Sequence, residues 1–535
     1  MLRFTRHYVS TVGHKEFRLL PDFQLKCGLE IHTQLNTRNK LFSRSTNDPF
    51  DSYNAPNYHT SFFDVALPGT LPKLNYEAIL YATRLAVALN SEVSSCSQFD
   101  RKHYFYGDQP LGYQITQHYN PFSKGGFIEL TKALDGIHQE RLHIDILQLQ
   151  IEQDTGKSIY KETDQTSLID LNRSNVPLIE MVTLPNFSDL KQIHSFIKKY
   201  QNLVRHLGIS TGDLETGAMR VDVNMSVNDF CRVELKNLPN TSSIMRAVEF
   251  EYKRQVDIIR SGDAAKLLKY SETRGWNGSQ TVKLRSKETT IDYRYMPDPE
   301  LPCITLSAEA VKGVKESLPI LPDKILHRLM ASPYDLSLKD AKILAINANG
   351  HDQQYNQGEL LNFYIETFAQ YTALVGSSFN AKLPTNWIIH ELLGNLNKLE
   401  FPLSSALIAL PPSNFAELLN LIHAKKISSA SAKLLLFHIL EAAKRSDVVE
   451  PVNLQELIAN FELDAIQEVD PEELRNICLQ IISEVNSPKL LEGIASGKKK
   501  GPLKYLVGQG MRLSQGRIKP QLFEDTFKQL LGVEW

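Results

Sequence analysis

The stretch that decides the fold of the N-terminal half reads Met219-Arg220-Val221-Asp222-Val223-Asn224-Met225-Ser226-Val227. Apolar and polar residues alternate along it without a break. Because successive side chains of a β-strand point to opposite faces of a sheet, this pattern predicts a strand with one buried and one polar face. The polar face carries Arg220, Asp222, Asn224 and Ser226, so charged groups stand in a row above an apolar layer.

The sequence before this strand predicts a large domain that mixes strands and helices. Residues 142–152 alternate apolar and polar for most of their length and predict another strand. Between the two, apolar residues from Leu190 to Leu207 follow helical spacing, with Ser188 as the predicted N-cap and Gly208 as the end of the helix. We therefore expect an α+β fold with one large mixed α/β domain at residues 24–305.

After Pro302 the pattern changes to helices almost throughout. Asn414 with Glu417 resembles a capping pair at the start of one of them. A turn cluster at residues 401–405, followed by Pro411 and Pro412, divides this helical part. We therefore expect an all-helical middle domain at residues 306–400 and a helical tail domain at residues 401–535.

The charge balance gives no global argument for nucleic-acid binding, because a domain that binds nucleic acid is usually strongly basic. The 535 residues include 59 Lys and Arg against 61 Asp and Glu, a net charge of −2. The apolar content of 42% is ordinary for a soluble globular protein. No apolar run approaches the ~20 residues that a membrane helix needs, so we expect no transmembrane segment.

The cysteines and the N-terminus indicate a compartment. The five cysteines are odd in number, widely spread and free of Cys-x-x-Cys pairs, which argues against a disulfide framework or a cysteine zinc site and fits a reducing compartment. The first acidic residue is Glu16, after a segment of arginine, hydroxyl and apolar residues. That composition is typical of a mitochondrial transit peptide, so we expect residues 1–23 to be a targeting segment. The alternative is a frayed terminus.

Two short motifs fail on context. Residues 208–212 fit the Gly-x-Ser-x-Gly pattern around Ser210, but a nucleophile elbow joins a strand to a following helix, whereas here the helix comes first. Residues 155–158, Thr-Gly-Lys-Ser, resemble the end of a phosphate-binding P-loop, but Ile151 stands where that loop needs its first glycine. We therefore expect neither a serine nucleophile nor a Walker-type nucleotide site.

Acidic residues occur in pairs two positions apart. Glu30 with His32 has the spacing that places two side chains on one face of a strand, and the pairs at 152/154 and 222/224 repeat it. Carboxylates with one imidazole have the ligand atoms to hold a divalent cation. Each pair taken alone is also consistent with a solvated strand face.

Two further segments carry charge or rings. Residues 292–299, Asp-Tyr-Arg-Tyr-Met-Pro-Asp-Pro, suit a fixed wall of a pocket or an aromatic turn packed on the sheet. Between 498 and 519 the chain has basic residues and no acid, which suits phosphate ligands or a solvated surface. The basic residues of this segment are Lys498, Lys499, Lys500, Lys504, Arg512, Arg517 and Lys519.

An ordered series of motifs closely resembles one family, the B subunit of glutamyl-tRNA(Gln) amidotransferase. The series begins with Gly28-Leu29-Glu30-Ile31-His32 and ends with Lys504-Tyr505-Leu506-Val507-Gly508-Gln509. Between them the matching segments are residues 66–72, 101–106, 113–117, 152–157, 170–173, 177–180, 234–237 and 292–295. The resemblance covers about residues 24 to 535.

The resemblance implies a two-step repair of a mischarged tRNA. ATP, with Mg²⁺, phosphorylates the γ-carboxylate of Glu-tRNA(Gln), and ammonia then displaces phosphate to give Gln-tRNA(Gln). It implies a heterotrimer, in which an amidase (A) subunit supplies ammonia and a small third subunit joins the two. The composition of the N-terminal segment adds the expectation that this complex is in the mitochondrial matrix. The sequence has no Gly/Ser-rich amidase region with a Ser-Ser-Lys triad, in agreement with that division. The domain at 24–305 is then the catalytic cradle domain, and the tail binds tRNA through its basic residues.

The resemblance also assigns roles within the acidic set. The expected metal-binding and catalytic residues are Glu30, His32, Glu152, Asp222 and Glu272. On charge and strand position, the expected clamps for phosphate or carboxylate groups are Arg220, Lys236, Arg274 and Arg294.

Two departures from the family pattern qualify these roles. The family usually has two adjacent glutamates at 152–153, whereas the second residue here is Gln153. Bacterial members often carry a cysteine zinc knuckle, but no cysteine lies between Phe42 and Leu67, so we expect no structural zinc. The rival hypothesis is a tRNA-binding scaffold that keeps the fold without the chemistry, and Gln153 is the feature that favours it.

Overall fold

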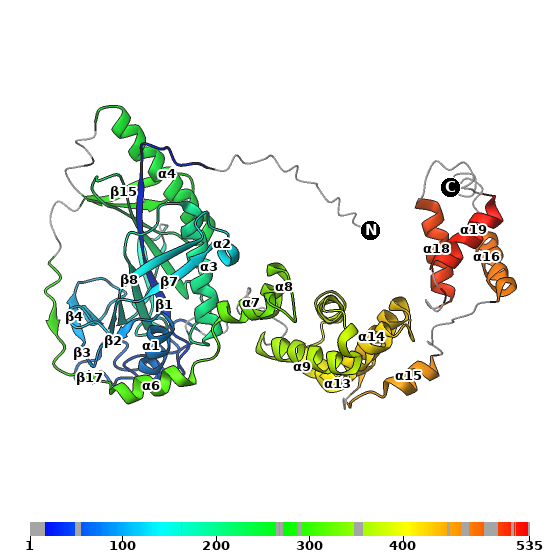
Figure 1. The fold of residues 1–535 in the computed structure, drawn as a ribbon. Coiled ribbons are helices and arrows are strands. Elements are labelled where there is room, and N and C mark those ends of the chain that lie inside the picture. The colour runs from blue at the N-terminus through cyan, green and yellow to red at the C-terminus, as the bar shows by residue number, and fades with distance from the viewer. Residues whose placement is uncertain are drawn as a thin grey trace. The chain divides into compact units, whose positions relative to one another are not determined.

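The computed structural model divides into two compact units, Met1–Asp323 and Lys324–Trp535. It describes residues 17–48, 55–161, 163–263, 267, 271–286, 292–346, 357–446, 450–461, 470–485, 501–514, 518 and 520–532. The predicted fold class is confirmed, because a mixed α/β unit is followed by a helical one (Figure 1). Among the described residues, no helix is both long and apolar enough to span a membrane.

A large, mostly antiparallel sheet forms the centre of the first unit. Its strands, in spatial order, are β15 (Thr281–Ser286), β14 (Glu272–Trp276), β13 (Val233–Lys236), β12 (Met219–Val227), β1 (Leu25–Gln34), β11 (Pro177–Thr183), β8 (Arg141–Gln153), β6 (Ser123–Lys124) and β2 (Glu92–Val93). β7 (Phe127–Thr131) also pairs with β8, and only the β13–β14 pair among these neighbours is parallel. The two strands predicted at 142–152 and 219–227 are both in this sheet.

The alternation of β12 produces the two faces of the sheet. Its apolar side chains, Val221 and Val223 among them, are fully buried, whereas its polar ones remain partly exposed. β1 pairs with β12 so that Gly28 lies opposite Asn224, Glu30 opposite Asp222 and Leu29 opposite Val223. Since side chains of directly opposite residues share a face, the polar row of β12 continues onto β1.

Helices cover the apolar face. α3 (Leu190–His206) and α4 (Thr241–Arg260) lie along it and pack against each other (Figure 1). Asp189, not Ser188, caps α3 by accepting a hydrogen bond from the Lys191 amide at 3.2 Å. Gly208 follows the helix in the left-handed conformation, with φ 68°. The other helices of this unit are α1 (Tyr76–Ala88), α2 (Lys132–Asp135) and α6 (Ala308–Ser317).

Three small sheets complete the unit. β4 (Asp100–His103) pairs with β5 (Tyr113–Thr116) on one side and with β16 (Met296–Pro297) on the other. β9 (Lys157–Lys161) pairs with β10 (Thr166–Asp170), and β3 (Cys96–Ser97) pairs with β17 (Ile304–Thr305). The β16–β4 pair brings the segment around residue 295 beside residues almost two hundred positions earlier in the chain.

The second unit is helical throughout its described parts. After α7 (Pro322–Met330), which begins at the end of the first unit, its helices are α8 (Leu338–Ala345), α9 (Gln357–Val375), α10 (Lys382–Asn386), α11 (Leu393–Leu399), α12 (Leu403–Ala409), α13 (Pro412–His423), α14 (Ser429–Arg445), α15 (Leu454–Asn460), α16 (Pro471–Val485), α18 (Gly501–Leu513) and α19 (Pro520–Leu531). A short 3₁₀ turn, η2 (Gly376–Ser378), follows α9, and a π-helical turn, η3 (Trp387–Leu392), joins α10 to α11.

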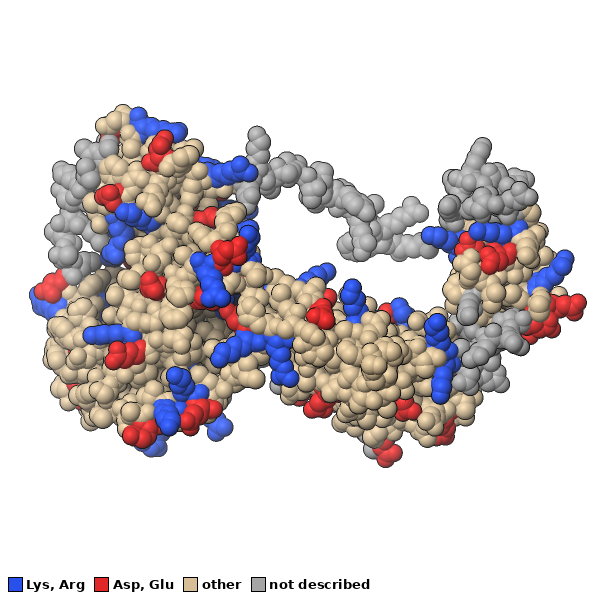
Figure 2. Space-filling view, viewed as in Figure 1, with Lys and Arg blue, Asp and Glu red and all other residues tan. Residues whose placement is uncertain are grey.

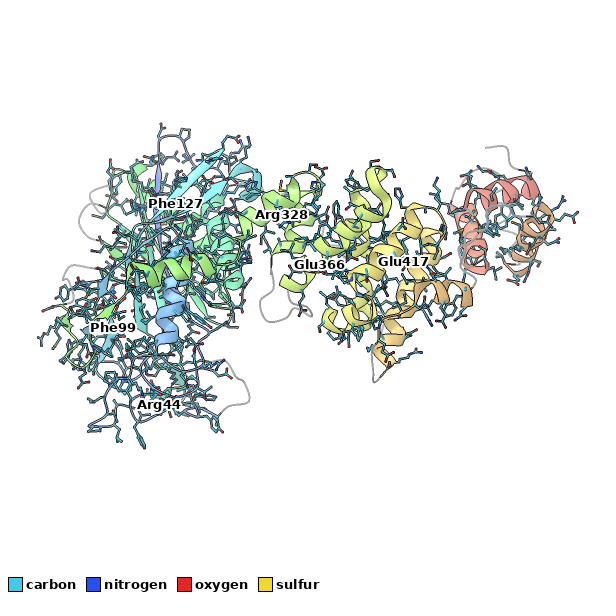
Figure 3. All side chains as sticks on the ribbon, turned by 60° about the horizontal axis from the view of Figure 1, so that its bottom comes forward. Arg44, Phe99, Phe127, Arg328, Glu366 and Glu417 are labelled. Carbon is cyan, nitrogen blue, oxygen red and sulfur yellow. The ribbon has the colours of Figure 1, made fainter. Side chains whose placement is uncertain are left out.

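The domain boundaries differ from those expected from the sequence. The first division falls after Asp323 rather than after 305, because α6 packs on α1 and stays with the sheet. Helices on either side of 400/401 pack together: α9 lies against α13, with the Phe363 and Phe415 rings 5.4 Å apart. Figure 3 shows Glu366 of α9 and Glu417 of α13 on these neighbouring helices.

The end of the chain has a core of its own. Buried side chains of α16, α18 and α19, such as Cys478, Leu506 and Phe523, form a separate cluster.

The predicted capping role of Asn414 is wrong, because α13 starts at Pro412 with Pro411 as its N-cap. The Asn414 amide donates instead to the carbonyl of Val452 at 2.7 Å.

Candidate active site

The polar face of four adjacent strands forms a cluster of acidic residues around one histidine. In the sheet register, β1 places Glu30 opposite Asp222 of β12 and His32 opposite Glu180 of β11. β8, on the far side of β11, contributes Glu152. The predicted strand spacing of Glu30 and His32 is confirmed, because both side chains lie on this face.

His32 is the centre of the cluster. Its Nε2 lies 3.4 Å from Glu30 Oε1, and its Nδ1 lies 3.3 Å from Glu152 Oε1. Glu152 Oε2 accepts a hydrogen bond from the Gln114 amide at 3.0 Å, and Glu180 Oε2 accepts one from Gln150 at 3.1 Å. These side chains line a cavity of about 350 Å³.

The cluster shifts the pKa values of its members. Burial raises the pKa of Glu30, but His32 and Lys236 outweigh it and lower that pKa to about 2. Burial lowers the pKa of His32, but the surrounding carboxylates hold it well above its usual value. Burial and the neighbouring Glu152 raise the pKa of Glu180 well above the ordinary range. Opposite shifts in one small site are typical of functional clusters.

Two basic residues border the cluster, each held by a carboxylate. Lys236 Nζ lies 2.7 Å from Asp222 Oδ2 and 3.2 Å from Glu234 Oε1. Arg220 Nη2 donates to Asp154 Oδ1 at 2.9 Å. Lys236 and Arg220, two of the predicted clamps, therefore lie close enough to the acidic cluster to contact an anion bound there.

The donor set fits a divalent cation. Glu30, His32 and Asp222 offer ligand atoms within 4.8 Å of one another, and so do His32, Glu152 and Glu180. Glu152 Oε1 is buried and faces His32 Nδ1 at 3.3 Å, without an aligned hydrogen bond. A buried carboxylate oxygen without an aligned donor can accept a further ligand. Several carboxylates with one imidazole suit Mg²⁺ or a similar cation.

The structure does not bring Glu272 and Arg274 to this cluster. They flank Thr273, whose hydroxyl donates to Glu234 on the polar face at 2.8 Å, so they point to the opposite, helix-covered face. There Arg274 Nε lies 3.4 Å from Glu251 of α4, and its Nη1 donates to Glu272 at 3.0 Å. We therefore leave both residues out of the site.

Arg294 and Gln153 also lie outside the acidic cluster. Arg294 lies at an exposed position after Tyr293, with φ 45° in the left-handed region. Gln153 follows Glu152 on β8, so its side chain points to the opposite face and occupies no ligand position in the cluster. The missing second glutamate therefore removes no charge from the acidic face.

The structure adds Glu180 to the residues expected from the sequence. Glu180 is the single charged residue of the strand Pro-Leu-Ile-Glu-Met-Val-Thr, which is otherwise buried or nearly so. A lone carboxylate within an apolar strand has a desolvation cost, and a residue with no role beyond folding rarely has such a cost. That signal could have identified it.

The rejected motifs have structural roles. Ser210 is buried beyond the end of α3, and its hydroxyl accepts from the Gly212 amide at 3.2 Å. Gly156 comes so close to the backbone that an added Cβ would lie 3.1 Å from the carbonyl oxygen of Asp108. Lys157 and Ser158 begin strand β9, and the Ser158 hydroxyl donates to Asp108 at 3.1 Å.

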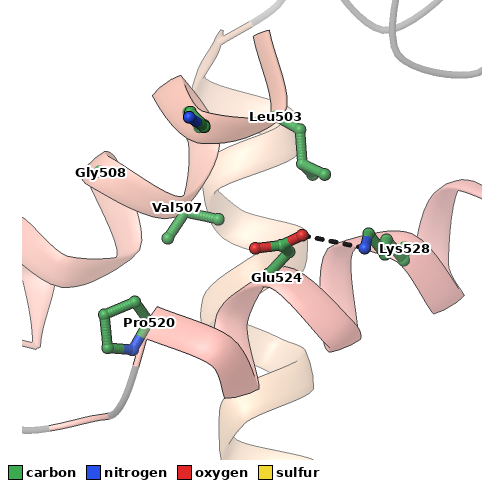
Figure 4. Close-up of a pocket in the computed structure, with 7 residues that line it drawn as sticks. Leu503, Val507, Gly508, Pro520, Glu524 and Lys528 are labelled. Carbon is green, nitrogen blue, oxygen red and sulfur yellow. Dashed lines mark ion pairs between the residues drawn. The ribbon is translucent and has the colours of Figure 1, made fainter. Parts of the chain in front are cut away.

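The predicted tRNA-binding tail is described in part. Lys504 and Arg512 are exposed on α18, whereas the expected residues Lys498, Lys499, Lys500, Arg517 and Lys519 lie outside the described residues. Lys504 borders a cavity of about 390 Å³ between α18 and α19, in which Glu524 pairs with Lys528 at 2.9 Å (Figure 4). On the side of the first unit that Figure 2 displays, basic and acidic side chains are interspersed.

Comparisons with known proteins find family matches over most of the chain. Residues 25–312 match the family described as GatB/GatE catalytic domain, and residues 369–531 match the one described as GatB domain. A protein of Lachancea thermotolerans, named as the mitochondrial B subunit of glutamyl-tRNA(Gln) amidotransferase, is 66% identical over 100% of this chain and 98% of its own length. Proteins of the same name from Zygosaccharomyces rouxii and Kluyveromyces lactis are 63% and 62% identical, with at least 99% of each chain covered.

Proposed function

Because this chain belongs to the GatB/GatE family, we propose that its acidic sheet face phosphorylates the γ-carboxylate of Glu-tRNA(Gln) with ATP. Amidation of that carboxylate then gives Gln-tRNA(Gln). Together the two steps are the glutaminyl-tRNA synthase (glutamine-hydrolysing) activity of the family. The chain is mitochondrial, as its relatives are named. A matrix location and cleavage of a targeting segment within residues 1–23 belong to the proposal, and residues 1–16 lie outside the described structure.

The cluster around His32 carries this proposal. Ammonia cannot displace an oxygen from a carboxylate, because oxide is a poor leaving group, whereas phosphate is a good one. Mg²⁺, when bound, would neutralise charge on the phosphate oxygens of ATP. The residues that would hold it are Glu30, His32, Glu152, Glu180 and Asp222. The observation that favours a cation there is the convergence of their ligand atoms, together with a buried Glu152 oxygen that faces His32 without an aligned hydrogen bond.

The reaction has two steps, phosphorylation of the carboxylate and its amidation. A γ-carboxylate oxygen of the esterified glutamate attacks the γ-phosphorus of ATP, and ADP leaves. Ammonia then attacks the acyl carbon and phosphate leaves, and the departing phosphate takes up the proton that the nitrogen loses. Lys236 and Arg220 stand at the edge of the acidic cluster, where they can bind the anionic groups of the acyl phosphate. Their carboxylate partners keep both cations in place between turnovers.

The proposed reaction needs a source of ammonia and a tRNA substrate. Membership of a family of B subunits implies further subunits and a tRNA substrate. We propose that an amidase (A) subunit releases the ammonia and that a small third subunit completes a heterotrimer. Lys504 and Arg512 of α18, with the remaining basic residues of the tail, would contact tRNA phosphates.

The test is ADP release from ATP by the reconstituted complex without glutamine, measured with and without Glu-tRNA(Gln). We expect release that depends on the tRNA and is lost in Glu30→Ala. Glu92→Ala, at an exposed position on β2, is the matched control and should behave as wild type. Tight tRNA binding without any tRNA-dependent ADP release would contradict the proposal and support the scaffold hypothesis.

A further inference from the structure

We propose that an aromatic wall beside the acidic cluster binds an adenine base. The aromatic wall consists of Tyr104, His118, Tyr293 and Tyr295, together with Lys102. This inference rests on the proposed function, and adenine enters that reaction from two sources, ATP and the 3′-terminal adenosine that carries the glutamate.

The wall and the cluster share one cavity. His118, Tyr295 and Lys102 line the same cavity of about 350 Å³ as Glu30 and His32. A ligand whose reactive end reaches the acidic residues can therefore place its other end against His118 and Tyr295. A base with a phosphate or an ester at its other end has the composition that such a cavity requires.

The rings form a connected series. His118 stacks on Tyr295 with centroids 3.8 Å apart and an interplanar angle of 9°. Tyr293 lies 6.0 Å from Tyr295, and Tyr104 lies 6.4 Å from Tyr293. Aromatic side chains in such arrays are the usual platforms for nucleobases, because every base has a π-face.

Lys102 places a positive charge where the rings meet the acids. Its Nζ lies 4.8 Å from the centre of the Tyr293 ring and 5.9 Å from that of Tyr104. It lines the same cavity as Glu152. A cation at this junction suits the phosphate of a nucleotide whose base lies on the rings.

The wall is fixed before any ligand arrives. The Tyr293 carbonyl accepts from the His103 amide at 2.9 Å, and the Tyr295 carbonyl accepts from the Tyr119 hydroxyl at 3.2 Å. The loop between β4 and β5 is anchored by the Gly156 amide, which donates to the Asp108 carbonyl at 2.8 Å. A preformed site has little ordering cost to meet on binding.

Packing alone does not account for these rings. His118 is exposed and Tyr104, Tyr293 and Tyr295 are half-buried, whereas rings that serve a core are fully buried. The same cavity is also lined by Gln148, whose amide offers a donor and an acceptor. A glutamine amide matches the donor and acceptor edge of adenine.

The experiment uses the complete complex with Tyr295→Leu, Tyr295→Phe and the control Tyr160→Leu, which removes an exposed ring on β9. The apparent KM for ATP and that for Glu-tRNA(Gln) are measured separately. We expect Tyr295→Leu to raise one of them about 10-fold or more, with kcat changed far less. Tyr295→Phe keeps the ring and should remain close to wild type.

The two arms distinguish the sources of adenine. A rise confined to ATP assigns the wall to the nucleotide, and a rise confined to the tRNA assigns it to the terminal adenosine. A rise in both, with Tyr295→Phe normal, means that both adenines use it. The inference would be overturned by unchanged KM values in Tyr295→Leu, or by a rise in KM in Tyr295→Phe as large as that in Tyr295→Leu. Absence of tRNA-dependent ADP release in wild type would instead refute the proposed function, so the two failures are separable.

Discussion

Two groups of buried charges lie on opposite faces of the same sheet, and they differ in how well their carboxylates are satisfied. On the helix-covered face, Glu251 of α4 accepts from Arg254 at 2.8 and 2.6 Å, from Gln255 at 2.9 Å and from Thr281 at 2.8 Å. On the polar face, one buried oxygen of Glu152 faces His32 Nδ1 at 3.3 Å without an aligned hydrogen bond. Both carboxylates are buried, but only one has unused ligand capacity.

This difference separates a structural ion cluster from a site. Glu251 has matching cations and donors from its own chain, so nothing further is needed to stabilise its charge. The acidic cluster holds Glu30, Glu152, Glu180 and Asp222 around His32, with Lys236 at its edge. Its charge is incompletely compensated, which is the condition under which a cation binds.

Removal of the central histidine should have the largest effect. His32→Ala should lower amidation by roughly 10³-fold or more, because it removes a ligand common to both candidate groups. Chromatography of the aminoacyl products of the complex measures this. tRNA binding and the thermal melting temperature should stay close to wild type, and a variant that amidates normally would remove the acidic face from the mechanism.

The opposite result is expected on the other face. Glu251→Ala should lower the free energy of unfolding by about 3 kcal/mol, because it removes the ion-pair partner of Arg254 and leaves Arg274 paired with Glu272 alone. Urea unfolding measures the loss. The fraction that remains folded should amidate normally. A stable variant with lost activity would make this group part of the site and end the distinction between the faces.

Glu180→Gln should have an intermediate effect. The amide keeps the size of the side chain but removes one ligand charge, so amidation should fall about 10-fold and need a higher Mg²⁺ concentration. A Mg²⁺ titration of amidation tests this, with Glu92→Gln as the control. An unchanged Mg²⁺ requirement would show that Glu180 does not contribute to the cation site.

The smallest effect is expected at Glu272, and it depends on pH. Burial raises the pKa of Glu272, but Arg274, Lys283 and Arg254 outweigh it and the pKa is lowered. Its ion pairs therefore stabilise the fold above the unfolded pKa of about 4.3 and lose that effect as the pH falls through the lower folded value. Glu272→Gln should cost no more than about 1 kcal/mol at pH 7, and the cost should decline below about pH 4.3 and vanish once the pH is below the folded pKa.

Urea unfolding at pH 7 and at several values below pH 4 measures this difference. Amidation by Glu272→Gln should stay within about twofold of wild type, as expected of a residue outside the site. A loss of activity as large as that of His32→Ala would restore Glu272 to the cluster.

Local spacing predicted much of this site. The period of two in β12 and the Glu-x-His pair in β1 were enough to infer strands with a polar face, and the register of the sheet brings those faces together. Spacing did not reveal the face on which Glu272 and Arg274 lie, because their strand is short and its neighbour, β13, is parallel to it. Glu180 was missed because it has no polar partner two residues away.

Long-range packing was harder to infer. A proline-rich turn near 401–412 was interpreted as a domain boundary, but α9 and α13 pack across it. The helix at 308–317 was assigned to the helical part, although its contact with α1 keeps it with the sheet. Both errors concern contacts between segments distant in sequence, which local periodicity does not encode.

The pairing of β1 with strands on both sides also restricts how its sequence can change length. A one-residue deletion before Glu30 would shift the register and turn Leu29 and Ile31 toward the polar face, while Glu30 and His32 would enter the apolar core. Substitutions change one contact at a time, but this deletion would exchange both faces at once. Descendants of this sequence should therefore accumulate insertions and deletions in the loops and keep the length of β1 constant.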